Sequence, residues 1–375
     1  MANDFIRSLP GHQRELSGRW LHAIHIDPLL LLLLLMVVGF GLVVLYSAVD
    51  ENYALFRAQV WRLALAFAVL IVAAQLPPHI YMRWAPFVYA LGVVLLVLVL
   101  FFGVVVKGSR RWLEIPGLIR FQPSELMKLA VPLAVAWYFH ARPLPPTLRD
   151  VGVALAIVAV PAGAIIAQPD LGTGILVAVA GLAGVVFAGL PWRWILYALL
   201  GFAAAAPGLW YALQDYQRQR ILTLFNPESD PLGAGWNILQ STTAIGSGGL
   251  WGKGLMAGTQ SRLDFLPEAR TDFIIAVVGE ELGLRGVLVL LVLYLLIILR
   301  GLVMATTAES TFGRLLSGAL ILTFFVYVFV NVAMVSGLLP VVGVPLPLVS
   351  YGGTSAITLM AGFGILMAIR THKAW

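Results

Sequence analysis

The stretch PLLLLLLLMVVGFGLVVLYSA, residues 28–48, decides the fold class of this chain. It contains no Asp, Glu, Lys or Arg, and its length of about 20 residues is enough for an α-helix to cross the hydrocarbon core of a bilayer. The same length is too great for the apolar core of a cleavable signal peptide. The stretch therefore predicts a first transmembrane helix.

The rest of the 375-residue chain repeats this pattern, with 60% hydrophobic and 11% charged residues and a mean hydropathy of +0.93. These values exclude an ordinary soluble domain. Because cysteine is absent, disulfides and thiolate metal sites are excluded as well. We therefore expect an all-α polytopic membrane protein, one domain over residues 1–375. Its spans of roughly 17–25 residues should lie near 28–48, 58–76, 84–106, 122–140, 150–167, 171–189, 191–211, 272–300, 312–336 and 350–370.

Basic residues predict the orientation of these ten spans. With an even number of spans, both ends lie on one side of the membrane, and that side carries the larger and more evenly spread basic set. Both termini, including segment 1–27, should therefore be cytoplasmic, and the long polar segment 213–271 should be an extracytoplasmic loop. The larger set is Arg7, Arg14, Arg19, Arg83, Arg142, Arg149, Arg193, Arg300, Arg314, Arg370 and Lys373, and the smaller is Arg57, Arg62, Lys107, Arg110, Arg111 and Arg120.

Asp272 is the candidate catalytic residue. It stands where a polar, Gly-rich stretch ends and a long apolar segment begins, so a carboxylate would lie close to apolar surface yet within reach of a polar substrate. Ionisable groups are costly in lipid and mark functional sites there. Five polar motifs from distant parts of the chain should reach the same outer face and form one site. They are Lys107–Trp112, Gln122–Glu125, Gln168–Asp170, Pro267–Asp272 and Ser350–Ser355.

Glu125 and Lys128 lie three residues apart on the same face of the fourth span, at a depth similar to that of Asp272. Two interpretations are open, and they are compatible. The pair could be a structural ion pair that ties this span to the eighth, and it could be part of the site, with the lysine orienting the Asp272 carboxylate.

The basic group Lys107, Arg110, Arg111 and Arg120 departs from the positive-inside pattern. Its side chains either snorkel to lipid phosphates or clamp a phosphate or pyrophosphate, which suits the planar fork of arginine. Trp112 beside them would stack on a sugar or anchor at the interface.

Other polar residues favour structural roles. Glu280, Glu281 and Arg285 lie deeper in the eighth span, and Glu281 and Arg285, four residues apart, should form a packing or partner-facing pair. Asp170 should cap the helix that it opens, although its side of the membrane keeps it a candidate for the site. The glycines of 246–254 lack the spacing of a phosphate-binding loop and should shape a loop against the membrane surface.

Taken together, these residues resemble the SEDS family of bacterial cell-wall synthesis. Three further motifs favour its elongation type over its division type, namely Trp236–Ser241, Gly248–Gly254 and Gly258–Ser261. The resemblance covers most of the chain and rests on several motifs in order. They are Arg111-Trp112, Phe121–Glu125 with Lys128, Gln168–Thr173, Leu266–Glu268, Thr271–Ile274, Gly279–Gly283 and Pro347–Gly353. One departure is Arg270, where the family usually has histidine. A cationic role is still possible at this position, but a role that needs a neutral imidazole is not.

The resemblance implies an inverting peptidoglycan glycosyltransferase acting on lipid II, a disaccharide-pentapeptide on undecaprenyl pyrophosphate, at the outer face of the cytoplasmic membrane. Asp272 would be the general base. Its charge partners would be Glu125, Lys128, Glu268 and Arg270, and the substrate would meet Lys107, Arg110, Arg111, Trp112, Gln122, Ser350 and Tyr351. A divalent cation, Mg²⁺ or Mn²⁺, is implied without a clear ligand set. The implied partners are a class B penicillin-binding protein and other membrane proteins of the elongation complex. No nucleic acid is implied as a partner.

Two other function classes compete with the enzyme. A lipid II flippase would predict an inverted repeat and polar, broken helices near the midplane, but the sequence has no convincing repeat and its polar motifs gather at one face. A non-catalytic scaffold for cell-wall enzymes is disfavoured by the clustered ionisable residues.

Overall fold

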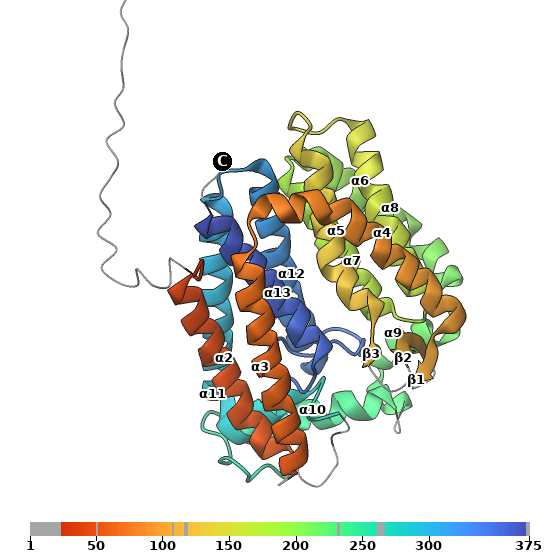
Figure 1. Cartoon of the computed structure of the whole chain (residues 1–375). Coiled ribbons are helices and arrows are strands. Elements are labelled where there is room, and N and C mark those ends of the chain that lie inside the picture. The colour runs from red at the N-terminus through yellow and green to blue at the C-terminus, as the bar shows by residue number, and fades with distance from the viewer. Residues whose placement is uncertain are drawn as a thin grey trace, which may run out of the picture.

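The computed structural model describes residues 24–49, 52–106, 109–115, 119–230, 233–260, 266 and 268–372, so residues 1–23 of the expected N-terminal segment lie outside the described part. The chain forms a bundle of long helices (Figure 1). These helices are α2 (Pro28–Ala48), α3 (Tyr53–Gln75), α4 (Pro78–Phe102), α5 (Pro123–His140), α6 (Leu148–Ile166), α7 (Leu171–Phe187), α8 (Trp192–Ala212), α11 (Ile274–Thr306), α12 (Thr311–Val335) and α13 (Thr354–Thr371).

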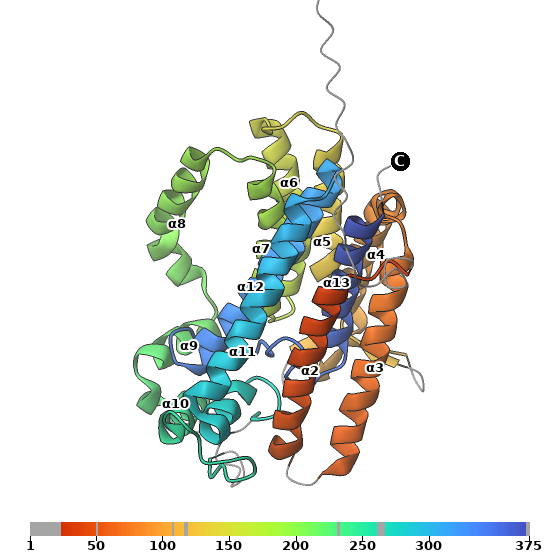
Figure 2. The ribbon, with the colours of Figure 1, turned by 90° about the vertical axis from the view of Figure 1, so that its left-hand side faces the viewer.

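Within the described residues, eight helices are long and apolar enough to cross a membrane. The two remaining expected spans correspond to α7, an apolar helix of 17 residues, and to α5, which packs between α4 and α12. The all-α polytopic fold is thus confirmed. Helix α8 stands away from the other helices, and none of its residues is buried (Figure 2).

Polar residues at the helix starts explain several boundaries. Asp27 caps α2 by accepting a hydrogen bond of 2.9 Å from the Leu30 N–H, and a side-chain cap of this kind satisfies an otherwise unpaired donor. The Asp27 carboxylate also binds Arg300 of α11 at 2.7 Å and Arg370 of α13 at 2.6 Å. Burial raises the pKa of Asp27, but the bonds from Arg300 and Leu30 and the charge of Arg370 outweigh it and hold this pKa below its ordinary value. One carboxylate therefore joins three helices at the end of the bundle where α13 finishes.

The third span differs from its expected range of 84–106. Helix α4 begins earlier, at Pro78, and ends at Phe102. Val104–Val106 instead forms strand β1, followed by β2 (Ser109–Ile115) and β3 (Ile119–Phe121), in an antiparallel sheet of order β1-β2-β3. The change of structure follows from Gly103, which leaves the helix with extended backbone angles, and from the β-branched valines that come next.

The polar segment 213–271 is more regular than a loop. It contains α9 (Asp215–Phe225), the 3₁₀ helix η1 (Pro227–Ser229) and α10 (Ala234–Gly248). Its glycines do not merely shape a surface loop, because they let backbones meet. A Cβ at Gly248 would lie 1.9 Å from the Gly279 carbonyl oxygen of α11. The N–H groups of Lys253 and Gly254 then donate to the carbonyls of Glu280 and Glu281.

Helix α11 is broken at Gly283, whose φ of 68° and ψ of −166° are not helical. The break corrects the expected pair of Glu281 and Arg285, because the four-residue spacing holds only on a continuous helix. Arg285 instead lies over the ring of Trp251, 3.8 Å from its centroid. Glu281 accepts a 2.6 Å hydrogen bond from Ser47 of α2. The buried Glu280 carboxylate accepts one from Lys253 at 2.7 Å, so both acids serve packing.

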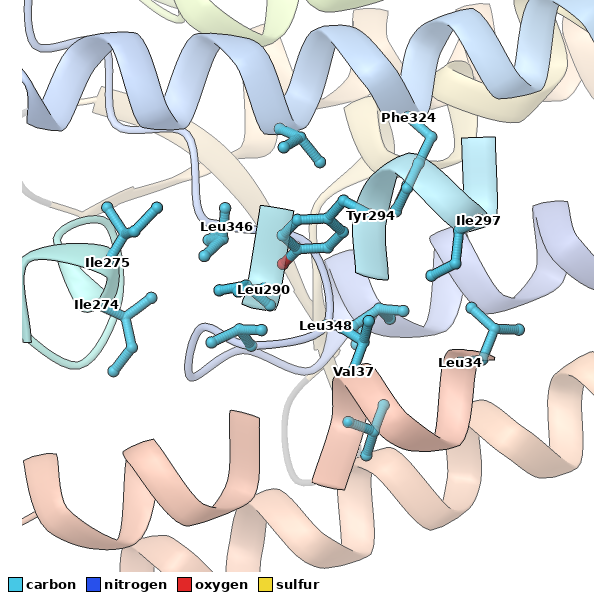
Figure 3. Packing of buried hydrophobic residues seen from close by; sticks show 14 of the residues in the cluster. Leu34, Val37, Ile274, Ile275, Leu290, Tyr294, Ile297, Phe324, Leu346 and Leu348 are labelled. Atoms are coloured by element: carbon cyan, nitrogen blue, oxygen red, sulfur yellow. The ribbon is translucent and has the colours of Figure 1, made fainter. Parts of the chain in front are cut away.

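The main apolar core lies between α2, α11, α12, α13 and the segment that joins the last two (Figure 3). Leu346 and Leu348 of that segment are buried beside Leu290 and Tyr294 of α11. The Tyr294 hydroxyl donates a 2.6 Å hydrogen bond to the Pro347 carbonyl. This anchoring fixes the 343–353 segment, which forms one wall of the site.

Candidate functional site

One pocket of about 360 Å³ receives residues from all five polar motifs and lies where α5, α7 and α13 begin, whereas Asp27 binds Arg370 near the end of α13. Asp272, Glu125 and Lys128 all contribute to its wall, as the sequence predicted. The lining residues are Arg111, Trp112, Gln122, Glu125, Lys128, Asp170, Thr173, Leu176, Glu268, Thr271, Asp272, Tyr327, Gly343, Val344, Pro345, Tyr351, Gly352, Thr354 and Ser355.

Asp272 lies in a turn that ends just before α11 begins at Ile274. The backbone of this turn is held from two directions. The Asn331 amide of α12 donates to the Asp272 carbonyl at 2.8 Å, and the Tyr351 N–H donates to the Arg270 carbonyl at 2.8 Å. The carboxylate lies against Gly343, where an added Cβ would sit 3.5 Å from Asp272 Oδ2. The turn is thus built from contacts with α12 and the 343–353 segment.

The Glu125–Lys128 pair is formed, with Lys128 Nζ 2.5 Å from Glu125 Oε1. Both side chains are nearly buried, at 12% and 7% exposed. Lys128 also lies over the Tyr327 ring, 4.8 Å from its centroid. The pair therefore links α5 to α12, not to the helix that carries Asp272, which corrects that part of the structural interpretation. The lysine donates to Glu125 and does not orient the Asp272 carboxylate by a hydrogen bond of its own.

The two adjacent arginines of β2 lie in different surroundings. Arg111 and Trp112 reach the pocket. Arg111 donates to the Pro169 carbonyl at 2.5 Å and lies 3.6 Å from Asp170. Arg110 is exposed and donates to the Leu100 carbonyl of α4 instead. The structure thus brings one arginine of the expected clamp to the pocket.

Asp170 is both a cap and part of the pocket wall. It accepts from the Thr173 N–H at the start of α7 and from the Gln122 side chain at 3.1 Å. Gln122 and Asp170 therefore join the starts of α5 and α7 beneath Arg111. Arg220 of α9 approaches this group as well: burial lowers the pKa of its guanidinium, and the charge of Arg111 lowers it further.

The remaining predicted residues fall in different places. Glu268, exposed and with φ of 58°, and Tyr351 line the pocket. Ser350 is buried and does not, because its hydroxyl closes the segment by donating to the Thr271 carbonyl and accepting from the Leu346 N–H. Arg270 turns away to the Ala48 carbonyl of α2. Lys107 and the side chain of Arg120 lie outside the described part.

Sequence reasoning missed three polar residues in or next to the pocket. Tyr327 and Asn331 are buried in α12, at 1% and 0% exposed. Gln59 of α3 is buried too, and its amide pairs with both the N–H and the carbonyl of Gly352. A usable signal existed for the two amides, since a polar side chain inside an apolar span is costly and marks function or buried bonding.

The implied divalent cation finds no matching site among the described residues, where no three His, Cys, Asp or Glu side chains come together as a metal-binding group. Glu125 and Asp170 already accept hydrogen bonds from Lys128 and Gln122.

Comparison with known proteins agrees with this architecture. Residues 23–374 match the profile of the cell cycle protein family of FtsW, RodA and SpoVE. The chain is 53% identical over 351 residues to the peptidoglycan glycosyltransferase MrdB of Escherichia coli K12, covering 93% of this chain and 95% of that protein. It is 36% identical over 364 residues to a probable peptidoglycan glycosyltransferase FtsW of Geobacter metallireducens, covering 92% and 95%.

Two solved structures have the same fold. One, described as structural coordination of polymerization and crosslinking by a peptidoglycan synthase complex, contains a chain that matches with a TM-score of 0.82 and 31% identity, covering 92% of this chain and 97% of that one. The rod shape determining protein RodA of Thermus thermophilus matches with a TM-score of 0.70 and 28% identity, covering 92% and 96%. The family profile spans nearly the whole chain and the relatives match over nearly all their length, so this chain belongs to the SEDS family, the FtsW, RodA and SpoVE cell cycle proteins.

Proposed function

We propose that this protein is a peptidoglycan glycosyltransferase that polymerises lipid II into glycan strands, with Asp272 as the general base. The observation that carries the proposal is the pocket in which Asp272 shares a wall with Arg111, Glu125 and Lys128. Its support from relatives is the 53% identity to a peptidoglycan glycosyltransferase.

In the proposed reaction, Asp272 takes the proton of an acceptor sugar hydroxyl while the oxygen of that hydroxyl attacks the anomeric carbon of the donor. The bond between that carbon and the undecaprenyl pyrophosphate breaks on the opposite side, so the α-linked donor becomes a β-linked product. The electron pair of the broken bond leaves with the pyrophosphate. A single displacement with a base on one face and a leaving group on the other follows the logic of inverting glycosidases, which use water in place of the hydroxyl.

The positively charged side chains of the pocket would balance the negative charge that develops on the leaving pyrophosphate. Arg111 is suited to this because its position is fixed by Pro169 and Asp170 before substrate arrives, and fixed donors need no reorganisation during the reaction. Trp112, the next residue of the strand and also on the pocket wall, offers an aromatic face for a sugar.

The proposal also covers the side of the membrane on which the reaction takes place and the partner proteins. We place the pocket at the outer face of the cytoplasmic membrane, with both termini cytoplasmic, on the basis of the basic residues of the loops. The partner is a class B penicillin-binding protein, in keeping with the polymerisation and crosslinking complex that contains a similar chain. Other elongation-complex proteins would assemble with the pair.

The decisive experiment is Asp272→Asn in purified protein supplied with labelled lipid II in detergent and its partner, with glycan polymer read on a gel. General acid–base catalysis contributes about 10²–10⁴-fold, so polymer should fall by that factor while folding and lipid II binding persist. Asp215→Asn is the matched control, because Asp215 lies on α9 with its carboxylate exposed and is not a pocket residue.

The competing flippase function makes a different forecast for the same assay, since no membrane has to be crossed in detergent. Undiminished polymer from Asp272→Asn would remove Asp272 from the mechanism. Absence of polymer from the wild-type protein with its partner present would favour the flippase instead.

A further inference from the structure

Asn331 occupies an unusual position in α12. It is 0% exposed, in a helix that is apolar enough to span the membrane. Its Nδ2 donates two hydrogen bonds, 2.8 Å to the carbonyl of Asp272 and 2.7 Å to the carbonyl of Val344. Since both partners are acceptors, the orientation of the amide is fixed: the nitrogen, not the oxygen, must face them.

The two carbonyls belong to the two walls that enclose the Asp272 carboxylate. Asp272 comes from the turn before α11, and Val344 follows Gly343, against which the carboxylate lies. A single side chain therefore sets the separation between the carboxylate-bearing turn and the segment opposite. The backbone at Gly343 has φ of 75°, so this segment can approach the carboxylate because glycine adopts that conformation without strain.

Packing alone does not account for an amide here. The Asn331 Oδ1 atom is buried and finds no hydrogen-bond partner among the described residues, and an unpaired buried acceptor is destabilising. An apolar residue would remove that penalty from α12 but would leave two backbone carbonyls without their donor. The bonds to the Asp272 and Val344 carbonyls, and not the packing of α12, therefore account for the amide.

Resting on the proposed function, we infer that Asn331 is a positioning residue for the Asp272 base: its amide locks the Asp272 and Val344 carbonyls together and so aims the carboxylate at the acceptor hydroxyl. It touches neither substrate nor reacting atoms, and acts through the backbone of the residue that does. Misplacement of a catalytic group by about 1 Å can lower a rate about 10²-fold, so loss of the amide should lower kcat by that order and leave KM for lipid II nearly unchanged.

The test uses the full-length protein with its partner and lipid II, and compares three variants with wild type. Asn331→Leu removes both donors and keeps the branching and the number of heavy atoms of the side chain. Asn331→Asp keeps the shape, but donates only when its carboxyl is protonated. Ser241→Ala is the control, because the Ser241 hydroxyl also makes a buried bond to a backbone carbonyl of α12, that of Val335 at 2.9 Å, away from the pocket.

We expect Asn331→Leu to lose about 10²-fold in kcat with lipid II binding retained, and Ser241→Ala to keep wild-type kcat. For Asn331→Asp, the ratio of its kcat to that of wild type should rise as the pH falls from 8.5 towards 5.5. The neutral acid regains one donor. The groups that face Asp272 in the pocket, which are Glu125, Lys128, Arg111, Asp170 and Glu268, are the same in both proteins, so taking the ratio at each pH isolates the effect of residue 331. A residue that only fills space would give a flat ratio.

Several results would overturn the inference. Wild-type kcat in Asn331→Leu, equal losses in Asn331→Leu and Ser241→Ala, or a flat ratio for Asn331→Asp would each do so. Failure of both Asn331 variants to fold would show that the amide holds the fold and not the base. Failure of the proposed function is a separate outcome, recognised by absence of polymer from the wild-type protein.

Discussion

The buried pair of Glu125 and Lys128 offers a test of whether these charges serve the fold, the site or both. Removing one partner of a buried ion pair strands the other charge and typically costs about 3–5 kcal/mol. Lys128→Met does this to Glu125, whose Oε2 atom is already buried without a partner among the described residues. It also removes the contact with the Tyr327 ring, worth roughly 0.5–2 kcal/mol. We therefore expect Lys128→Met to lower the free energy of unfolding by an amount near the upper end of the range of about 3–5 kcal/mol.

The double variant Glu125→Leu/Lys128→Met separates the two roles. Replacing both charges by apolar groups of similar volume is often neutral for stability or better, so the double variant should unfold at nearly the wild-type point. Its polymerising activity should nevertheless stay low, because both side chains line the pocket of Asp272 and the positive charge facing the substrate is gone. The two single variants complete a double-mutant cycle.

Two measurements are needed for each variant. Unfolding by SDS titration in mixed micelles reports stability, and lipid II polymerisation at saturating substrate reports kcat. Arg142→Met is a contrast, since Arg142 is 45% exposed in its ion pair with Asp150 and exposed pairs contribute little. If the double variant recovered stability and activity together, the pair would be purely structural, and the idea that these charges act in the site would be wrong.

Three further predictions concern the membrane orientation, the arginines of β2 and the Asp27 cap. Ser229→Cys should react with an impermeant maleimide in intact spheroplasts and Ser310→Cys should not, and the reverse labelling would contradict the orientation. Arg111→Gln should weaken lipid II turnover far more than Arg110→Gln, because only Arg111 lines the pocket; equal kinetic effects would favour plain lipid anchoring. Asp27→Asn should lower stability at neutral pH. Since the pKa of Asp27 is lowered in the folded protein, its contribution is full above the unfolded value of about 3.9 and is lost as the pH falls through the folded one, so unfolding curves of variant and wild type should converge in acid.

The sequence by itself determined the class of the protein and the membership of its site. Apolar runs such as 28–48 specify transmembrane helices through length and composition alone, which are local properties. The alternation of spans then assigns each polar motif to one end of the bundle. For that reason the gathering of Asp272, Glu125 and Lys128 in one pocket was predictable without coordinates.

Only the tertiary structure decided which atoms of those motifs do what. In the folded chain Arg111 lines the pocket, whereas Arg110 donates to a carbonyl of α4. Ser350 turns inward and donates to the Thr271 carbonyl. The amide of Asn331 reaches a carbonyl 59 positions earlier in the chain. The physical reason is that hydrophobic patterning acts between neighbours along the chain, whereas a buried hydrogen bond depends on which distant backbone groups the packed helices leave within about 3 Å of each other.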